Sequence, residues 1–152
     1  MSGPVRLEAG GGAIDRMKPL RFAFDGQSLS GFAGDTVASA LLANGVSIVG
    51  RSFKDHRPRG VFSAGIEEPN AILDLSHGSR HDPLCRATIE PLAEGMVLRS
   101  VHAQGTAARD GLSYIDRFAR FIPSGFYYKT FLWPSWEAYE ARIRAMAGIG
   151  TL

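Results

Sequence analysis

Apolar side chains alternate in two short runs of the chain, and a tight-turn dipeptide separates the runs. Residues 20–24 and 27–32 place apolar groups at about every second position, and Asp25-Gly26 lies between them. Alternation of this period is typical of strands with one buried face, and Asp-Gly is a strong hairpin signal. The pattern therefore predicts a β-hairpin.

A short helix is predicted directly after the hairpin. Thr36 offers N-cap chemistry, residues 37–43 are small and apolar, and Asn44-Gly45 provides a left-handed stop. We expect a helix of about nine residues that is stable only if its apolar side is buried. The expected contacts join two leucines of the helix to three residues of the hairpin: Leu41, Leu42, Phe22, Phe24 and Leu29.

Further strands are predicted at 46–49, 71–75, 86–89 and 96–101, with a mobile polar loop at 76–83. A hairpin, a crossing helix and then more strands is the order of a β-grasp domain. We therefore expect an α+β fold in which a mixed, ferredoxin-like sheet packs on one helix. The order of elements alone leaves other α+β arrangements open.

The composition divides the chain into three parts. Residues 1–18 are rich in glycine and predict a flexible arm, 19–103 form the β-grasp domain, and 104–152 predict a helical, aromatic-rich extension. Within the extension, 114–121 is amphipathic and 137–146 predicts a last short helix. The aromatic run at its centre predicts packing on a parent domain or partner, or into the chain's own core; both alternatives are open.

The overall composition excludes several classes of protein. The 152 residues are 45% hydrophobic and 21% charged, which is ordinary for a globular protein. A net charge of +2 is too small for a general polyanion binder, so no nucleic-acid partner is expected. No run approaches the roughly 18 apolar residues of a membrane span, and no secretory signal is present. We expect a cytoplasmic protein without a membrane partner.

A dense basic run lies within residues 51–60. It contains Arg51, Lys54, His56, Arg57 and Arg59. Like charges at this density repel one another, so they are tolerated in water and favoured against phosphate or carboxylate. The three arginines are the strongest candidates because guanidinium binds such anions bidentately. A solvated basic loop and an anion-binding loop are both open.

Cysteine and histidine contribute little candidate chemistry. Cys85 is the single cysteine, which excludes an intramolecular disulfide and any all-cysteine metal site within one chain. We interpret Cys85 as a small buried hydrophobe. His77, His81 and His102 lack the spacing of a metal site, and we expect them at the surface.

Longer strings carry a family resemblance. They are Pro19-Leu-Arg-Phe, Phe24-Asp-Gly, Gly34-Asp-Thr, Ala38-Ser-Ala-Leu-Leu-Ala-Asn-Gly45, Gly50-Arg-Ser-Phe-Lys54, His56-Arg-Pro-Arg-Gly60, Gly65, Glu68-Pro-Asn70 and Gly125-Phe-Tyr-Tyr-Lys-Thr-Phe131. Together they resemble the start of the alpha subunit of heterotetrameric sarcosine oxidase, over about residues 10–150. The resemblance implies a 2Fe-2S-type ferredoxin-like domain, and it implies that a dinucleotide-binding domain would begin where this chain ends.

The chain departs from the cluster-binding members of this group. Similar domains in hydrogen cyanide synthase and amino-acid dehydrogenase complexes carry a C-x4-C-x2-C group and a fourth cysteine. Those cysteines would fall near Ser63, Glu68, Ala71 and Thr88, none of which supplies a thiolate. We therefore expect a scaffold domain without an iron–sulfur cluster or other metal.

The resemblance also implies a complex. Its partners would be the beta, gamma and delta subunits and the rest of the alpha subunit. The complex oxidises sarcosine at FAD, passes electrons through FMN to oxygen, and transfers the one-carbon unit to tetrahydrofolate; NAD binds a later part of the alpha subunit. This segment itself is expected to be non-catalytic and to bind no cofactor alone, with the basic run facing the FMN phosphate or an acidic surface. Alternatives are an N-methylglutamate dehydrogenase or hydrogen cyanide synthase-like complex, or a free β-grasp adaptor.

Overall fold

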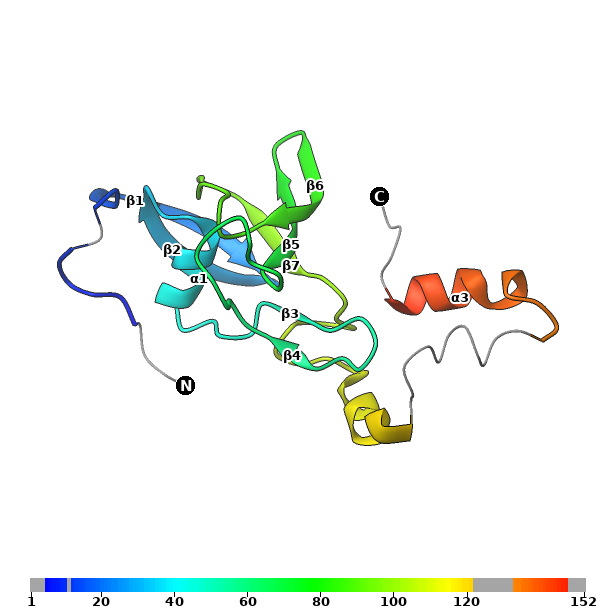
Figure 1. The fold of residues 1–152 in the computed structure, drawn as a ribbon. Coiled ribbons are helices and arrows are strands. Elements are labelled where there is room, and N and C mark those ends of the chain that lie inside the picture. Colours follow the sequence, from blue (N-terminus) through cyan, green and yellow to red (C-terminus); the bar gives the residue numbers. More distant parts are fainter. Residues whose placement is uncertain (1–4, 11, 122–132, 148–152) are drawn as a thin grey trace.

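The computed structural model describes residues 5–10, 12–121 and 133–147. An α+β domain is followed by two helical segments that lie on the side of β3 and β4 (Figure 1). The strands are β1 (Asp15–Phe24), β2 (Gln27–Ala33), β3 (Gly50–Arg51), β4 (Pro58–Arg59), β5 (Ile72–His77), β6 (Arg80–Arg86) and β7 (Val97–Ser100). The helices are α1 (Val37–Ala43), the 3₁₀ helix η1 (Ser113–Phe121) and α3 (Glu137–Ala147).

The main sheet is mixed and has five strands in the order β2-β1-β7-β5-β6. The predicted hairpin is confirmed, since β1 and β2 pair antiparallel. Asp25 (φ 48°) and Gly26 (φ 80°) both take left-handed backbone, as the tight turn between these strands requires. β1 pairs in parallel with β7. β1 also begins at Asp15, within the segment that the sequence assigned to the arm.

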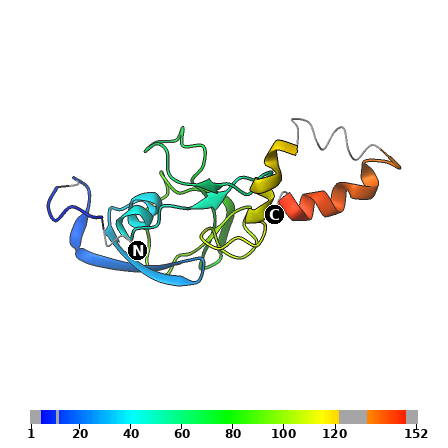
Figure 2. The ribbon, with the colours of Figure 1, turned by 90° about the horizontal axis from the view of Figure 1, so that it is seen from below.

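Helix α1 lies across one face of this sheet (Figures 1 and 2). Its N-cap is Thr36, whose Oγ1 accepts the Ser39 N–H at 3.2 Å. Its seven residues are fewer than the nine expected. Leu41 is fully buried as predicted, but Leu42 is 42% exposed, and that prediction is wrong. Successive residues turn through about 100° in a helix, so only one of two adjacent leucines faces the sheet.

Three predicted elements differ from the structure. Residues 46–49 form no strand, although Val49 is fully buried. Residues 76–83, expected to be a loop, belong to the hairpin of β5 and β6. Of the strand expected at 86–89, only Arg86 lies in a strand, as the last residue of β6, and 87–89 form a turn. The hairpin escaped the sequence because β6 is an edge strand with one face in water, where polar side chains are compatible with strand structure. The strands at 71–75 and 96–101 are confirmed as β5 and β7, with small shifts in their bounds.

The extension is described only in part. The helix predicted at 137–146 is confirmed by α3. Residues 122–132, which hold most of the aromatic run, lie outside the described residues. Within the described ranges, no helix is both long and apolar enough to cross a membrane.

Candidate functional site

The basic run folds into a short hairpin of residues 50–59, which is called the bracket below. β3 and β4 pair antiparallel, and the residues between them turn tightly. Ser52 N–H donates to the Arg57 carbonyl at 2.9 Å, and His56 N–H donates to the Ser52 carbonyl at 3.0 Å. His56 takes a left-handed backbone at φ 53°, which is uncommon for a residue with a side chain. The bracket fixes the direction in which each basic side chain leaves the backbone.

His56 points into the protein. Its Nδ1 lies 2.7 Å from Asp110 Oδ2, and both residues are buried. The Asp110 carboxylate also accepts the N–H groups of Gln104 (2.8 Å) and Leu112 (3.1 Å). Burial acts to raise the pKa of Asp110, but these N–H groups and His56 outweigh it and lower that pKa. The histidine therefore joins the basic bracket to the segment that follows β7.

Arg51 and Arg57 are also engaged within the chain. Arg51 donates its Nε to the Ala107 carbonyl at 2.8 Å and its terminal nitrogens to the carbonyls of His56 and Ala108. Arg57 Nε lies 2.5 Å from Asp116 Oδ1 at the surface, and this hydrogen bond raises the pKa of Arg57. The Arg51 guanidinium therefore stabilises the bracket, whereas the Arg57 pair is exposed to solvent and contributes little.

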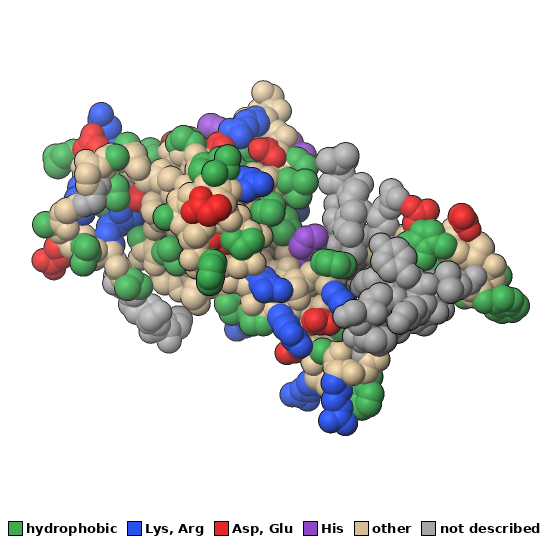
Figure 3. Space-filling view, viewed as in Figure 1, with side chains coloured by type: hydrophobic (Ala, Val, Ile, Leu, Met, Phe, Trp, Pro, Cys, Tyr) green, Lys and Arg blue, Asp and Glu red, His purple; other side chains and the backbone are tan. Residues whose placement is uncertain are grey.

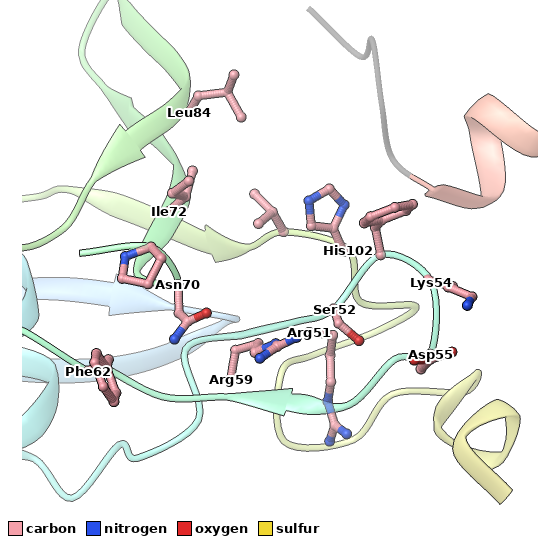
Figure 4. Close-up of a pocket in the computed structure, with 13 residues that line it drawn as sticks. Arg51, Ser52, Lys54, Asp55, Arg59, Phe62, Asn70, Ile72, Leu84 and His102 are labelled. Carbon is pink, nitrogen blue, oxygen red and sulfur yellow. The ribbon is translucent and has the colours of Figure 1, made fainter. Parts of the chain in front are cut away.

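A hollow of about 760 Å³ opens beside the bracket (Figure 4). Its lining residues come from the bracket, the loop before β5, the β5–β6 hairpin and the end of β7: Arg51, Ser52, Phe53, Lys54, Asp55, Arg59, Phe62, Pro69, Asn70, Ile72, Leu84, Val101 and His102. Three cations and one carboxylate make its wall positive, and Lys and Arg side chains gather on this face in Figure 3. Phe62 and Leu84 add exposed apolar surface at 84% and 62%.

The structure thus separates the five candidate residues. Arg51, Lys54 and Arg59 line the hollow, whereas His56 and Arg57 turn away to Asp110 and Asp116 and are absent from its lining. Among the residues that the structure describes, the exposed Arg59 guanidinium has no hydrogen bond or ion pair. Arg59 is therefore the candidate best placed to receive an outside anion.

Sequence reasoning missed two buried or partly buried carboxylates that hold this region. Asp25 was interpreted only as a turn residue, yet it accepts the Ser100 N–H and Oγ–H and the Ala107 N–H, at 2.8, 2.9 and 2.8 Å. Asp110 was not singled out. The sequence did not reveal either role, because Asp25 pairs with Ser100 and Ala107, and Asp110 with His56, across more than 50 residues. Through them, the contacts of the domain continue past Ala103 to Leu112.

Hydrogen bonds connect the four positions of the missing cysteines to one loop between β4 and β5. The backbone N–H groups of Ser63 and Ala71 both donate to the Glu68 carboxylate, and Thr88 Oγ1 donates to the Gly65 carbonyl. The Glu68 side chain, 2% exposed, thus lies within the loop where a cluster would need thiolates.

Cys85, the single cysteine, lies in β6. It is buried, and burial, Glu90 and Asp82 raise the pKa of its thiol to about 12. The described ranges hold no group of three or more His, Cys, Asp or Glu placed to bind a metal ion. These residues do not fit a 2Fe-2S cluster.

The five-stranded mixed sheet and helix α1, which crosses it, identify the class of protein. The loop between β4 and β5 lacks the cysteines of the cluster-binding members of this class. Residues 17–103 match the family described as "2Fe-2S iron-sulfur cluster binding domain", and the chain belongs to this family. It is homologous to sarcosine oxidase alpha subunits. It is 49% identical over 142 residues to "Sarcosine oxidase subunit alpha" of Rhizobium meliloti (strain 1021), covering 91% of this chain and 14% of that protein. The subunit of Corynebacterium sp. (strain U-96) is 54% identical over 119 residues, covering 76% of this chain and 12% of that protein.

The resemblance stated from the sequence is therefore confirmed. The chain spans 14% or less of the length of these two relatives. A solved structure, L-proline dehydrogenase from P. horikoshii, matches 57% of this chain and 16% of its own at 23% identity with a TM-score of 0.45, too low to carry an argument.

Proposed function

We propose that this chain is a ferredoxin-like, β-grasp segment of a sarcosine oxidase alpha-type subunit, and that it serves as a scaffold without iron and without catalytic groups of its own. The observation that carries the proposal is the 49% identity to a sarcosine oxidase alpha subunit across 91% of the chain. The replacement of all four cluster cysteines supports a structural role rather than electron transfer.

In this proposal the chain works with the rest of an alpha subunit and with beta, gamma and delta subunits. The assembly oxidises sarcosine to glycine, yielding hydrogen peroxide and either formaldehyde or methylene-tetrahydrofolate. This segment binds none of FAD, FMN, NAD and tetrahydrofolate by itself; the assembly as a whole holds them. The segment contributes surface and shape to the assembly.

The hollow beside the bracket is the proposed contact for an anion, either the FMN phosphate or a carboxylate of a neighbouring subunit or domain. Arg59 and Lys54 present positive charge to it. Arg51 and His56 are assigned a different role, because their hydrogen bonds to Ala107 and Asp110 hold the bracket in place. Arg57 is paired with Asp116 at the surface. The wall combines positive charge with exposed apolar side chains, an arrangement that suits an acidic group belonging to a larger binding surface.

The assembly is tested by co-expressing the chain with its genomic neighbours and purifying through a tag on this chain. Recovery of a beta-type subunit with flavin absorption is the expected result. Activity on sarcosine, N-methylglutamate and glycine then separates the sarcosine oxidase assignment from the two related complexes. A colourless chain that is recovered alone would instead favour a free adaptor.

The hollow is tested by charge reversal. Arg59→Glu is expected to lower recovered subunits or bound FMN by about tenfold or more, because a repulsive charge then faces the anion. Arg21→Glu is the matched control, since Arg21 is an exposed arginine of β1 outside the hollow. Equal recovery with both variants would remove the hollow from the proposal while leaving the family assignment intact.

A further inference from the structure

The loop between β4 and β5 closes around one carboxylate. Glu68 Oε2 accepts the N–H groups of Phe62 (2.7 Å) and Ser63, and Oε1 accepts those of Asn70 (2.8 Å) and Ala71 (3.3 Å). The glutamate is 2% exposed. The two ends of the loop therefore meet through one side chain, and not through backbone pairing with each other.

Contacts from the end of β6 and from the turn after it complete this arrangement. Thr88 Oγ1 donates to the Gly65 carbonyl at 2.8 Å, and the Arg86 guanidinium donates to the Ile66 carbonyl. Thr88 is buried. The outer part of the loop is thereby tied to the sheet, while its inner N–H groups face the carboxylate.

Four inward N–H groups form a site for negative charge. Successive backbone N–H groups that point to one place bind anions, and such concavities are recurrent in iron–sulfur sites. Here the chain itself supplies the negative centre: within the described residues, the Glu68 carboxylate accepts hydrogen bonds only from backbone N–H groups of its own loop. A buried carboxylate with four donors is well satisfied, whereas the same N–H groups without a partner would be costly.

We propose that the Glu68 carboxylate takes the place of the iron–sulfur cluster as the anionic centre that holds this loop, so that the domain keeps its loop without iron. The role is one of positioning. The loop supplies Phe62, Pro69 and Asn70 to the wall of the hollow (Figure 4), so Glu68 also shapes that surface. The inference rests on the geometry of this chain and stands independently of the proposed complex.

Hydrogen exchange in the full wild-type chain is the first test. The amides of Phe62, Ser63, Asn70 and Ala71 are expected to exchange at least tenfold more slowly than those of Gly78 and Ser79, which lie at the exposed tip of the β5–β6 hairpin. Equal exchange in the two sets would overturn the proposal. This measurement requires no variant to fold.

Substitution of the carboxylate is the second test. Glu68→Gln is expected to lower Tm by about 5 °C or more and to speed exchange at the four loop amides, since one acceptor oxygen becomes a donor. Glu67→Gln is the matched control because Glu67 is its exposed neighbour, and it should change neither readout. Glu68→Asp keeps the charge on a shorter side chain and should restore part of the protection. If Glu68→Gln does not fold, the test rests on amide exchange in Glu68→Asp and in the wild-type chain. A Glu68→Gln variant with the wild-type Tm and wild-type exchange at the four amides would overturn the proposal.

Iron is the third test. The wild-type chain is incubated anaerobically with ferrous iron and sulfide and then desalted. The expected result is no bound iron, no 2Fe-2S absorption and unchanged exchange at the four amides. A stable cluster that alters exchange at these amides would show that the loop still accepts the metal group and would overturn the proposal.

Discussion

The side chains of His56 and Asp110 meet at 2.7 Å inside the protein, although 54 residues separate them in sequence. The pair joins the basic bracket to the segment after β7, and the carboxylate is held by two backbone N–H groups on its other oxygen. A histidine within a basic run is therefore a structural residue here. Arg57 and Arg59, its neighbours in the basic run, remain exposed at the surface.

Removal of the Asp110 carboxylate is expected to destabilise the domain. Asp110→Ala leaves the buried His56 and two backbone N–H groups without their acceptor, and we expect a loss of about 3 kcal/mol in the free energy of unfolding. Urea denaturation followed by circular dichroism measures the change. Asp116→Ala breaks the exposed pair with Arg57 and should cause no measurable change, because surface ion pairs contribute little. Equal effects of the two substitutions would contradict the structural role of His56.

Arginines of the same run are expected to differ in stability. Arg51→Ala removes a donor from three backbone carbonyls and should cost about 2 kcal/mol. Arg59→Ala removes an exposed side chain and should stay within about 0.5 kcal/mol. Thermal denaturation of both variants in one buffer checks the difference. A destabilised Arg59→Ala would mean that its guanidinium has a structural partner in the folded chain.

The N-terminal segment is expected to contribute to stability through one ion pair. Arg6 lies on Asp35 with two hydrogen bonds of 3.1 and 2.7 Å, and the Asp35 side chain is fully buried. Asp35→Asn should lower the free energy of unfolding by about 3 kcal/mol and expose the first residues to trypsin. Asp15→Asn, which removes an exposed partner of Lys18, should do neither. Wild-type protease resistance in Asp35→Asn would contradict this prediction.

Acid is expected to unfold the protein through its buried carboxyls. Burial raises the pKa values of Asp35, Glu68 and Asp110, but the hydrogen bonds that each receives outweigh burial and lower all three below their ordinary values of 3.8 and 4.5. The unfolded chain then binds more protons than the folded chain at low pH. The stabilisation is present above the ordinary values and is lost as pH falls through the lowered ones. Urea denaturation from about pH 6 down to about pH 2.5 measures it, and a flat profile would contradict it.

The single thiol is expected to be inert in the folded protein. Cys85 is 2% exposed, and burial followed by Glu90 and Asp82 raises the pKa of the thiol to about 12. The thiolate is the reactive form, so a disulfide reagent at neutral pH should not modify the native chain but should modify it fully in denaturant. Rapid modification of the native chain would show that β6 opens readily at the edge of the sheet.

The local chemistry of the sequence determined the first part of the fold. Alternation around Asp25-Gly26 predicted the hairpin, and the cap at Thr36 predicted the start of α1, because both signals act within a few residues. The sequence also showed the motifs shared with the family and the lack of cluster cysteines, and the comparisons confirm the family. The burial of Cys85 also agrees with the interpretation of a small hydrophobe.

Only the tertiary structure decided what the charged residues do. The sequence placed five basic candidates in one run, but it could not tell which of them meet Asp110, Asp116 and the carbonyls of Ala107 and Ala108, since those partners lie over 50 residues away. The same is true of the Glu68 carboxylate, whose four N–H donors converge only when the loop closes. Hairpin and cap signals depend on neighbouring residues, whereas the role of a charge depends on which distant groups desolvate and pair with it.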